Sequence, residues 1–211
     1  MKIYTVASGE RFEQAAQISK ASFERFGYDY TIFKPEIINS MFTPEQLARN
    51  QYYDILYYKF CVAPGLIDDD KIMFVDADTY CQRPLALECM DWSKLNVAPD
   101  PASDRNKKQM GRDMDFYFNS GVAMFNRNFA GRLVNEFAPW VRKHIDDEVM
   151  RTYGDQTWLN LWCLEVGVPI KQLGYWWNNR NIQFDQRAYI WHPGGRGSVG
   201  IEQIQRLANG Y

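Results

Sequence analysis

One stretch decides the fold: Lys71-Ile72-Met73-Phe74-Val75-Asp76-Ala77-Asp78-Thr79. Its four consecutive apolar residues predict a short buried strand, which ends in two carboxylates one residue apart. A parallel strand delivers the residues that follow it to the carboxyl edge of the sheet, where open α/β sheets bind ligands. Two acids at this edge suit a hard divalent cation that in turn holds phosphate oxygens. A solvated acidic turn is the alternative reading of the pair.

The composition is that of a globular protein. The chain has 211 residues, of which 46% are hydrophobic and 24% charged, so we expect one domain over residues 1–211 with a sizeable core. Aromatic residues reach 16%, which suits stacking on bases or sugar rings, although a core built from aromatics explains most of them. The net charge is −2 and no basic block stands out, which argues against a nucleic-acid partner.

The sequence carries no targeting or membrane pattern. Met1–Glu10 lacks the charged-then-apolar order of a signal peptide, and no apolar run approaches the ~20 residues of a membrane span. No two cysteines have CxxC spacing, so we expect reduced thiols rather than a zinc site or a disulfide frame. They are Cys61, Cys81, Cys89 and Cys163. These features together predict a cytoplasmic protein.

The beginning of the chain predicts a βαβ unit. Lys2–Ala7 is β-prone and reads as the first strand. Glu10–Phe26 has apolar residues at helical spacing, and Gly27 is a suitable terminator. Strand character returns over Tyr28–Phe33. A strand, a helix and a strand within about thirty residues favour a parallel sheet.

A helix is predicted from Thr43 to about Val62. Thr43 is a suitable N-cap, Pro44 takes the first helical position, and Gln46 completes a capping box. Lys59 lies next to the predicted inner face and near the helix end that feeds the Asp76 strand; a solvated lysine is the alternative. The predicted inner face consists of Leu47, Ile55, Tyr58 and Val62.

The middle of the chain predicts two more strands around a loop. Leu95–Ala98 reads as a short strand that leads into Pro99-Asp100. Residues 101–115 are polar without periodicity, which predicts a mobile loop and a possible lid. Phe116–Phe125 predicts a strand interrupted at Asn119-Ser120-Gly121, where a polar triplet indicates a bulge or the approach of a ligand.

Two helices are predicted further along. The first covers Phe129–His144, with a kink at Pro139. The second covers Thr157–Val166, with Asp155 as its N-cap and Gly167 as its terminator. Beyond these helices the chain reads as irregular and rich in aromatic residues.

His192 is a candidate third ligand for a metal at Asp76 and Asp78. Two carboxylates and an imidazole form a mixed oxygen and nitrogen set that suits manganese better than calcium, with magnesium as the alternative cation. The glycine-rich turn after His192 would let backbone amides approach phosphates, and Arg196 would add a fork of donors. The spacing leaves open a histidine that only packs in the core or at the surface.

These motifs together resemble the glycogenin-type, family 8-like retaining glycosyltransferases, which have the GT-A fold. The matching segments, in chain order, are Tyr58-Lys59-Phe60, Phe74-Val75-Asp76-Ala77-Asp78-Thr79, Ala98-Pro99-Asp100, Phe118-Asn119-Ser120-Gly121-Val122, Gly154-Asp155-Gln156, Trp177-Asn178 and His192. The chain also resembles the N-terminal glycosyltransferase domain of a larger chlorella-virus protein.

The resemblance implies an α/β fold of the GT-A type, a mixed Rossmann-like sheet flanked by helices. It implies a metal-dependent hexosyl- or deoxyhexosyltransferase that moves a sugar from a UDP-sugar, or another nucleoside-diphosphate sugar, to a glycan or other acceptor with retention. Asp155 and Gln156 would be catalytic, and Asp76, Asp78 and His192 would bind Mn2+ or Mg2+. Implied donor contacts come from Ala7, Ser8, Lys59, Asp76, Ala77, Asp100, Asn119, Ser120, Gly195 and Arg196.

The sequence departs from the family pattern near its end. Ser198 stands where the family has a lysine, the Pro-Trp that follows is absent, and Arg196 is the candidate replacement for that lysine. The tyrosine that glycogenin glucosylates on itself has no counterpart, which favours transfer to another molecule.

Two alternative functions are open at this stage. A haloacid-dehalogenase-type phosphatase also places two aspartates after a strand, but its threonine lies two residues after the second acid, whereas Thr79 follows Asp78 directly. A carbohydrate- or nucleotide-sugar-binding module without chemistry would fit the aromatic content, including Trp176-Trp177.

Overall fold

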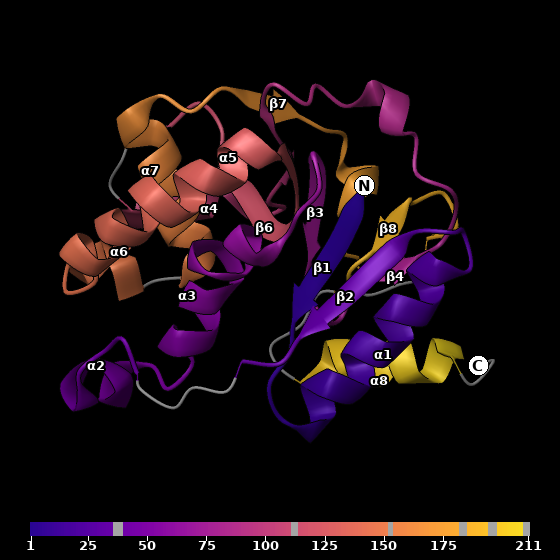
Figure 1. The fold of residues 1–211 in the computed structure, drawn as a ribbon, viewed down its shortest axis with the longest axis horizontal. Coiled ribbons are helices and arrows are strands. Elements are labelled where there is room, and N and C mark those ends of the chain that lie inside the picture. Colours follow the sequence, from indigo (N-terminus) through magenta and orange to yellow (C-terminus); the bar gives the residue numbers. More distant parts are fainter. Residues whose placement is uncertain (36–39, 111–113, 152–153, 182–184, 194–197, 209–211) are drawn as a thin grey trace.

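A mixed β-sheet with helices on both faces is the frame of the protein (Figure 1). The computed structural model describes residues 1–35, 40–110, 114–151, 154–181, 185–193 and 198–208. Within these ranges, the main sheet has six strands in the order β2-β1-β3-β6-β5-β7. The strands are β1 (Lys2–Val6), β2 (Asp29–Phe33), β3 (Lys71–Val75), β5 (Leu95–Pro99), β6 (Phe118–Asn126) and β7 (Ile170–Gln172).

Strand direction sends three strand ends to one edge of the sheet. β1 pairs in parallel with β2 and with β3, which confirms the predicted βαβ opening. β6 is antiparallel to both β3 and β5. β1, β3 and β5 therefore run in the same direction and deliver their following residues to the same carboxyl edge, where β6 begins.

The helices form two layers, one on each face of the sheet (Figure 1). The helix α1 (Glu10–Glu24) packs on one face together with α8 (Ser198–Ala208) and the small sheet of β4 (Tyr80–Cys81) and β8 (Ile190–Trp191). The opposite layer contains α3 (Tyr53–Cys61), α5 (Arg127–Arg132), α6 (Ala138–His144) and α7 (Asp155–Val166). Two further helices are α2 (Pro44–Arg49) and α4 (Ser103–Met110).

The side chains of successive strand residues pack alternately against these two layers. Tyr4 and Phe74 belong to the apolar cluster under α3 and α5–α7, whereas their neighbours Ile3 and Met73 belong to the cluster on the α1 side. All four side chains are fully buried. The apolar run at 72–75 thus reflects a strand covered on both faces, as parallel strands in α/β sheets are.

The predicted helix from Thr43 to Val62 is two helices. The capping box at Thr43 and Gln46 is confirmed, but α2 ends at Asn50, whose backbone is extended with φ −155° and ψ 105°. The Asn50 side chain accepts a hydrogen bond from the amide of Tyr52, which favours the break before α3. The predicted inner face was also wrong in part, because Leu47, Ile55, Tyr58 and Val62 are only partly buried, and Tyr53, Tyr57, Phe60 and Cys61 fill the core.

Two expectations for residues 101–126 are corrected. The predicted loop contains the helix α4, which follows Asp100, a residue whose carboxylate accepts a hydrogen bond from the amide of Ala102. Residues 111–113 of that loop lie outside the described ranges. β6 runs unbroken through Asn119-Ser120-Gly121, so the predicted break in the strand is absent. The bulge predicted there is confirmed, because the register of β6 against β5 shifts between the pairs Val97–Ala123 and Pro99–Phe118.

The helical prediction for 129–144 holds with one change. α5 continues through a π-helical segment, Leu133–Phe137, into α6, and Pro139 lies just after that segment. A wider turn there is compatible with a residue that has no amide hydrogen to donate. Gly167 ends α7 with φ 65°, as predicted. α8 was not expected from the sequence.

Two further findings concern membranes and cysteines. Among the described helices, none is both long and apolar enough for a membrane span. All four cysteines are free, in agreement with the predicted reduced thiols.

Candidate metal and donor site

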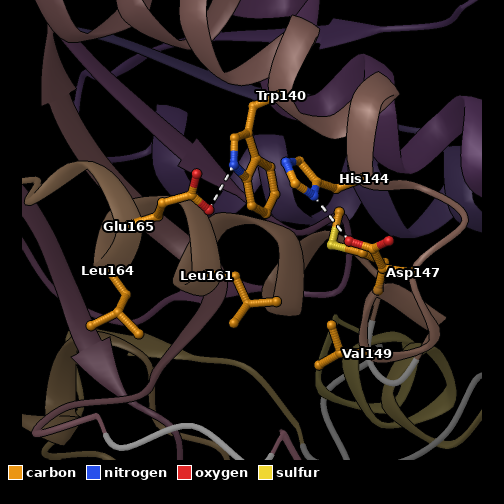
Figure 2. A pocket seen from close by; sticks show the side chains of 8 residues that line it. Trp140, His144, Asp147, Val149, Leu161, Leu164 and Glu165 are labelled. Atoms are coloured by element: carbon orange, nitrogen blue, oxygen red, sulfur yellow. Dashed lines mark hydrogen bonds and ion pairs between the residues drawn. The ribbon is translucent and has the colours of Figure 1, made fainter.

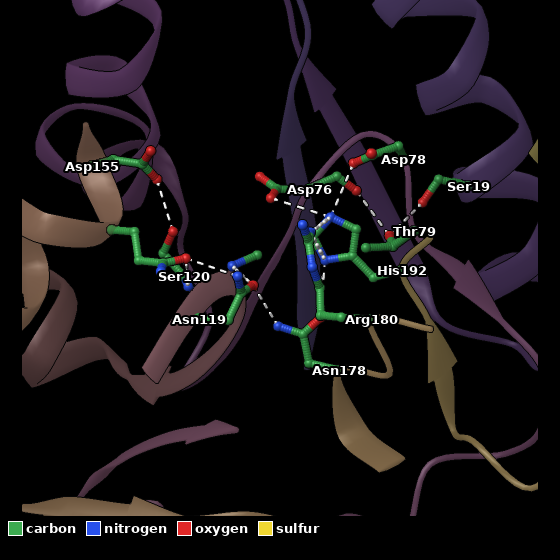
Figure 3. A network of polar contacts seen from close by, with 12 residues as sticks. Ser19, Asp76, Asp78, Thr79, Asn119, Ser120, Asp155, Asn178, Arg180 and His192 are labelled. Atoms are coloured by element: carbon green, nitrogen blue, oxygen red, sulfur yellow. Dashed lines mark hydrogen bonds and ion pairs between the residues drawn. The ribbon is translucent and has the colours of Figure 1, made fainter. Parts of the chain in front are cut away.

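Acidic and polar side chains converge at the carboxyl edge of the sheet (Figure 3). Asp76 and Asp78 follow β3, and Asp100 follows β5. Asn119 and Ser120 lie in the first residues of β6, and Asp155 and Gln156 open α7. The strand directions explain why residues so distant in sequence meet here. Ala7 and Ala77 are buried at the same edge, and Ser8 is exposed.

Asp76, Asp78 and His192 form a cluster that could hold a metal ion. The Nε2 atom of His192 lies 3.2 Å from a carboxylate oxygen of Asp78 and 3.6 Å from one of Asp76. His192 is only 1% exposed, whereas the side chains of Asp76 and Asp78 are 27% and 22% exposed. One buried imidazole and two partly open carboxylates form a site that remains accessible from one side.

The spacing of these three side chains fits a divalent cation. A small cation that holds six ligands at about 2.1 Å places neighbouring ligand atoms roughly 3 Å apart, close to the two distances above. The Nδ1 atom of His192 lies 2.9 Å from the Oδ1 atom of Asn178, to which it donates in the neutral tautomer that leaves Nε2 with its lone pair. The donor set, two carboxylates and an imidazole, suits Mn2+ or Mg2+.

Gly121 leaves room for the side chains of this cluster to lie close to β6. A Cβ atom at position 121 would stand 2.3 Å from Cε1 of His192 and 2.6 Å from Oδ2 of Asp76, far inside van der Waals contact. The amide of Asp76 also donates to the carbonyl of Gly121 at 2.8 Å. The glycine in the polar triplet therefore allows the side chains of His192 and Asp76 to lie directly against the backbone of β6.

Lys59 is buried within the site and is not a solvated lysine. Its ammonium lies 2.8 Å from Asp76 and 2.7 Å from Asp155, and Ser120 donates a hydrogen bond to the same Asp155 oxygen at 3.1 Å. Burial acts to lower the pKa of Lys59, but Asp155 and Asp76 outweigh it and raise the pKa above its usual value. The lysine is therefore a permanent cation that links the metal cluster to the start of α7.

The two aspartates that flank Lys59 shift in opposite directions. Burial alone would raise the pKa of Asp76, but Lys59 and His192 lower it below the usual range, with a smaller contribution from Arg180. Burial raises the pKa of Asp155, the charge of Asp76 raises it further, and Lys59 compensates only in part. Asp155 was predicted as an N-cap; that was wrong, because Gly154 takes this position with φ 56° and the Asp155 side chain turns to Lys59 instead.

An amide network joins two predicted donor contacts, Asp100 and Asn119, with the predicted catalytic residue Gln156. Asn119 donates to Asp100 at 3.2 Å and to the side-chain oxygen of Gln156 at 2.7 Å. Gln156 in turn donates to Asp100 at 3.0 Å, and Asn178 donates to Asn119 at 2.7 Å. The structure thus brings together Asp100, Asn119 and Gln156, and it connects them through Asn178 to His192.

A cavity of about 370 Å³ opens beside the carboxylates. Its lining contains Ser8, Lys59, Asp76 and Ala77 from the predicted set, together with Asp78. It also contains residues that the sequence did not single out: Val6, Phe12, Tyr52, Ile55 and Leu56. Phe12 is 38% and Tyr52 is 52% exposed, so aromatic rings are accessible at this cavity. Exposure cannot be read from the sequence, so no signal there distinguished these two aromatic residues from those of the core.

Not every predicted residue can be placed. Gly195 and Arg196 lie outside the described residues, so their predicted contacts with the donor stay predictions. Arg180, which sequence reasoning did not select, contacts His192 with its guanidinium. No motif distinguished this arginine in the sequence.

Another cavity, of about 280 Å³, lies between α6 and α7 and away from the carboxylates (Figure 2). Trp140, Leu161 and Leu164 supply most of its apolar lining. Two polar pairs lie at its rim: Trp140 donates to Glu165 at 3.0 Å, and Nδ1 of His144 contacts Asp147 at 2.9 Å. Its histidine and acids do not converge as a metal site would require: within the described residues, the group of ligand atoms that lie close enough together is that of Asp76, Asp78 and His192.

The fold and this edge of the sheet together define a protein of the GT-A-like glycosyltransferase fold. The chain is similar in structure to mouse xyloside xylosyltransferase 1 in its apo form, with a TM-score of 0.60 and 12% sequence identity. The alignment covers 94% of this chain and 99% of the mouse chain. No protein-family model and no curated protein sequence matches the chain. At this identity the likeness concerns the fold.

Proposed function

We propose that this protein is a metal-dependent glycosyltransferase that uses a nucleoside-diphosphate sugar as donor. The observation that carries the proposal is the cluster of Asp76, Asp78 and His192, which lies at the end of a central strand and borders a cavity of about 370 Å³. In a GT-A-like fold, such a cavity has the position in which open α/β sheets bind nucleotides. The fold also argues against the phosphatase alternative.

Each group of residues has a separate task in this proposal. Asp76, Asp78 and His192 hold Mn2+ or Mg2+, which supplies positive charge for the diphosphate that leaves. Phe12 and Tyr52 offer ring faces to the base of the donor. The sugar hydroxyls are hydrogen-bonded by three residues of the amide network, Asp100, Asn119 and Gln156.

The reacting carbon of the sugar lies near the start of α7 in this proposal. The anomeric carbon gains positive charge as the donor bond breaks, as it does in glycoside hydrolysis. Asp155 provides negative charge there, and Lys59 fixes the orientation of its carboxylate. The resemblance to glycogenin-type enzymes favours a UDP-sugar, a glycan acceptor and retention, with the departing diphosphate taking the proton of the acceptor.

Slow hydrolysis of the donor tests the proposal without knowledge of the acceptor. UDP-, GDP- and TDP-sugars are incubated with the protein and Mn2+, and release of the nucleoside diphosphate is measured with and without EDTA. We expect Mn2+-dependent release from a UDP-sugar and a decrease of roughly 100-fold or more in Asp78→Asn, because one ligand of the cation is lost. Asp68→Asn is the matched control, since Asp68 is exposed and pairs with Arg127 at the surface.

Two outcomes would contradict the proposal. Release that persists in Asp78→Asn and in EDTA would show that the cluster is not required for the chemistry. Binding of a nucleotide sugar without any metal-dependent turnover would favour the alternative of a binding module.

A further inference from the structure

The guanidinium of Arg180 lies against the metal-ligating nitrogen of His192. One nitrogen of Arg180 is 2.7 Å from Nε2 and 3.2 Å from Nδ1 of the imidazole. The same Nε2 faces the carboxylates of Asp76 and Asp78 (Figure 3). A cation of the chain itself therefore lies against one of the three ligands of the proposed metal, at the nitrogen that the metal would take.

The backbone around Arg180 holds it in this position. The amide of Asn179 donates to the carbonyl of Ile190, and the amide of His192 donates to the carbonyl of Asn179. Asn178 fixes the imidazole from its other side at 2.9 Å. Arg180 and His192 therefore lie on two adjacent, hydrogen-bonded segments, and only the long arginine side chain has the freedom to turn away.

We propose that Arg180 is an internal counter-cation: it competes with the divalent cation for the cluster of Asp76, Asp78 and His192 and, once displaced, binds the diphosphate of the donor. This inference rests on the proposed function. Arginine suits both states, because its planar fork of donors matches phosphate oxygens and it stays charged at any physiological pH. Lys59 is unsuited to this exchange, since Asp76 and Asp155 bind it from two sides.

The proposal predicts effects of opposite sign on the two ligands. Without Arg180, the cation that lies against Nε2 of His192 is gone, so Mn2+ should bind more tightly in the absence of nucleotide. The diphosphate, however, loses a charge-assisted partner, so UDP should bind more weakly to the Mn2+-loaded protein. If Arg180 only supported the local structure, its loss would weaken the binding of both ligands.

Calorimetric titration can separate the two effects. Mn2+ is titrated into the nucleotide-free protein, and UDP is titrated into the protein saturated with Mn2+. In Arg180→Ala we expect Mn2+ affinity to rise about 10-fold if Arg180 occupies the cluster roughly nine-tenths of the time. We expect UDP affinity to fall about 10- to 100-fold. Arg180→Lys keeps the charge without the fork and should bind UDP with intermediate affinity.

Arg187→Ala is the matched control. Arg187 lies on the same part of the chain, but it pairs with Asp185 and stacks on Trp176 at the surface. Its loss should change neither affinity.

The outcomes distinguish this inference from the proposed function. If the parent protein binds neither Mn2+ nor UDP, the proposed function fails. If the parent binds both, but Arg180→Ala binds Mn2+ no more tightly or UDP no more weakly, the role of Arg180 is overturned. Should Arg180→Ala fail to fold, Arg180→Lys decides: UDP affinity equal to that of the parent overturns the proposal.

Discussion

The two cavities of this protein differ in the chemistry of their walls more than in size. The cavity at the sheet edge, about 370 Å³, borders Asp76, Asp78 and a buried Lys59. The cavity between α6 and α7, about 280 Å³, has an apolar lining, and its polar groups pair near the surface. Volume alone would not tell them apart. The buried charges distinguish the two cavities. Burying a charge costs free energy, and apolar side chains of similar size would often stabilise the fold as well, so the charges at the sheet edge indicate a functional site.

The difference between the two cavities therefore predicts different effects of substitutions at each of them, which experiments can test. Substitutions at the sheet edge should affect ligand binding and stability together, because the same ion pairs serve both. Substitutions around Trp140 should affect stability alone.

The largest effect is expected for Lys59→Met. This change leaves the buried Asp155 and the partly buried Asp76 without the cation between them, and the loss of one partner from a buried ion pair such as Lys59–Asp155 costs about 3–5 kcal/mol. Urea unfolding measures this loss. Lys94→Met is the control, since Lys94 is exposed and pairs with Asp91 at the surface, and it should stay within about 0.5 kcal/mol of the parent.

The pH dependence of Lys59→Met gives a further check with a definite sign. Without Lys59, burial and mutual repulsion raise the pKa of both aspartates beyond the values in the parent. When a carboxyl group has a raised pKa in the folded state, the folded protein becomes less stable as the pH rises through that pKa. The variant should therefore be more destabilised at about pH 7.5 than at about pH 4.5. A destabilisation that is equal at both pH values would contradict this account of the site.

A smaller loss of stability is expected for Gly121→Ala, together with a loss of metal binding. The added Cβ atom would collide with His192 at 2.3 Å and with Asp76 at 2.6 Å, and such overpacking costs typically about 1–3 kcal/mol. Mn2+ affinity, measured by calorimetry, should fall at least about 10-fold because both ligands must shift. Gly131→Ala is the matched control, because a Cβ atom there meets nothing within 4 Å.

The stability of the control variant, Gly131→Ala, should change in the opposite direction. Gly131 lies in α5, where alanine is favoured over glycine by roughly 0.5–1 kcal/mol. Unchanged Mn2+ binding in Gly121→Ala would show that the close approach of His192 and Asp76 to β6 has no part in the metal site.

The smallest effect is expected at the other cavity. Leu164 is 46% exposed, so Leu164→Ala should cost no more than about 1 kcal/mol and leave Mn2+-dependent donor hydrolysis within about twofold of the parent. Thermal unfolding and the hydrolysis assay measure the two quantities. A tenfold loss of hydrolysis would remove the distinction between the cavities.

Local sequence patterns determined the elements that need few partners. The apolar run at 72–75 and the acids that follow it predicted β3 and the position of Asp76 and Asp78. A run of apolar residues indicates a buried strand, and the residues that follow a strand lie at its carboxyl end. The capping box at Thr43 and the terminator Gly167 were predicted for the same reason, since each acts within one turn of chain.

Tertiary structure decided what depends on partners far along the chain. Lys59 is 96 residues from Asp155 in sequence, and only the packing of α3 beside α7 makes it a buried bridge and not a solvated lysine. Arg180 became part of the site because Asn179 pairs with the segment that carries His192, a contact that no local pattern encodes. Local sequence determines which segments form, whereas the energy of a charge depends on its distance to other charges and to water, which the fold alone sets.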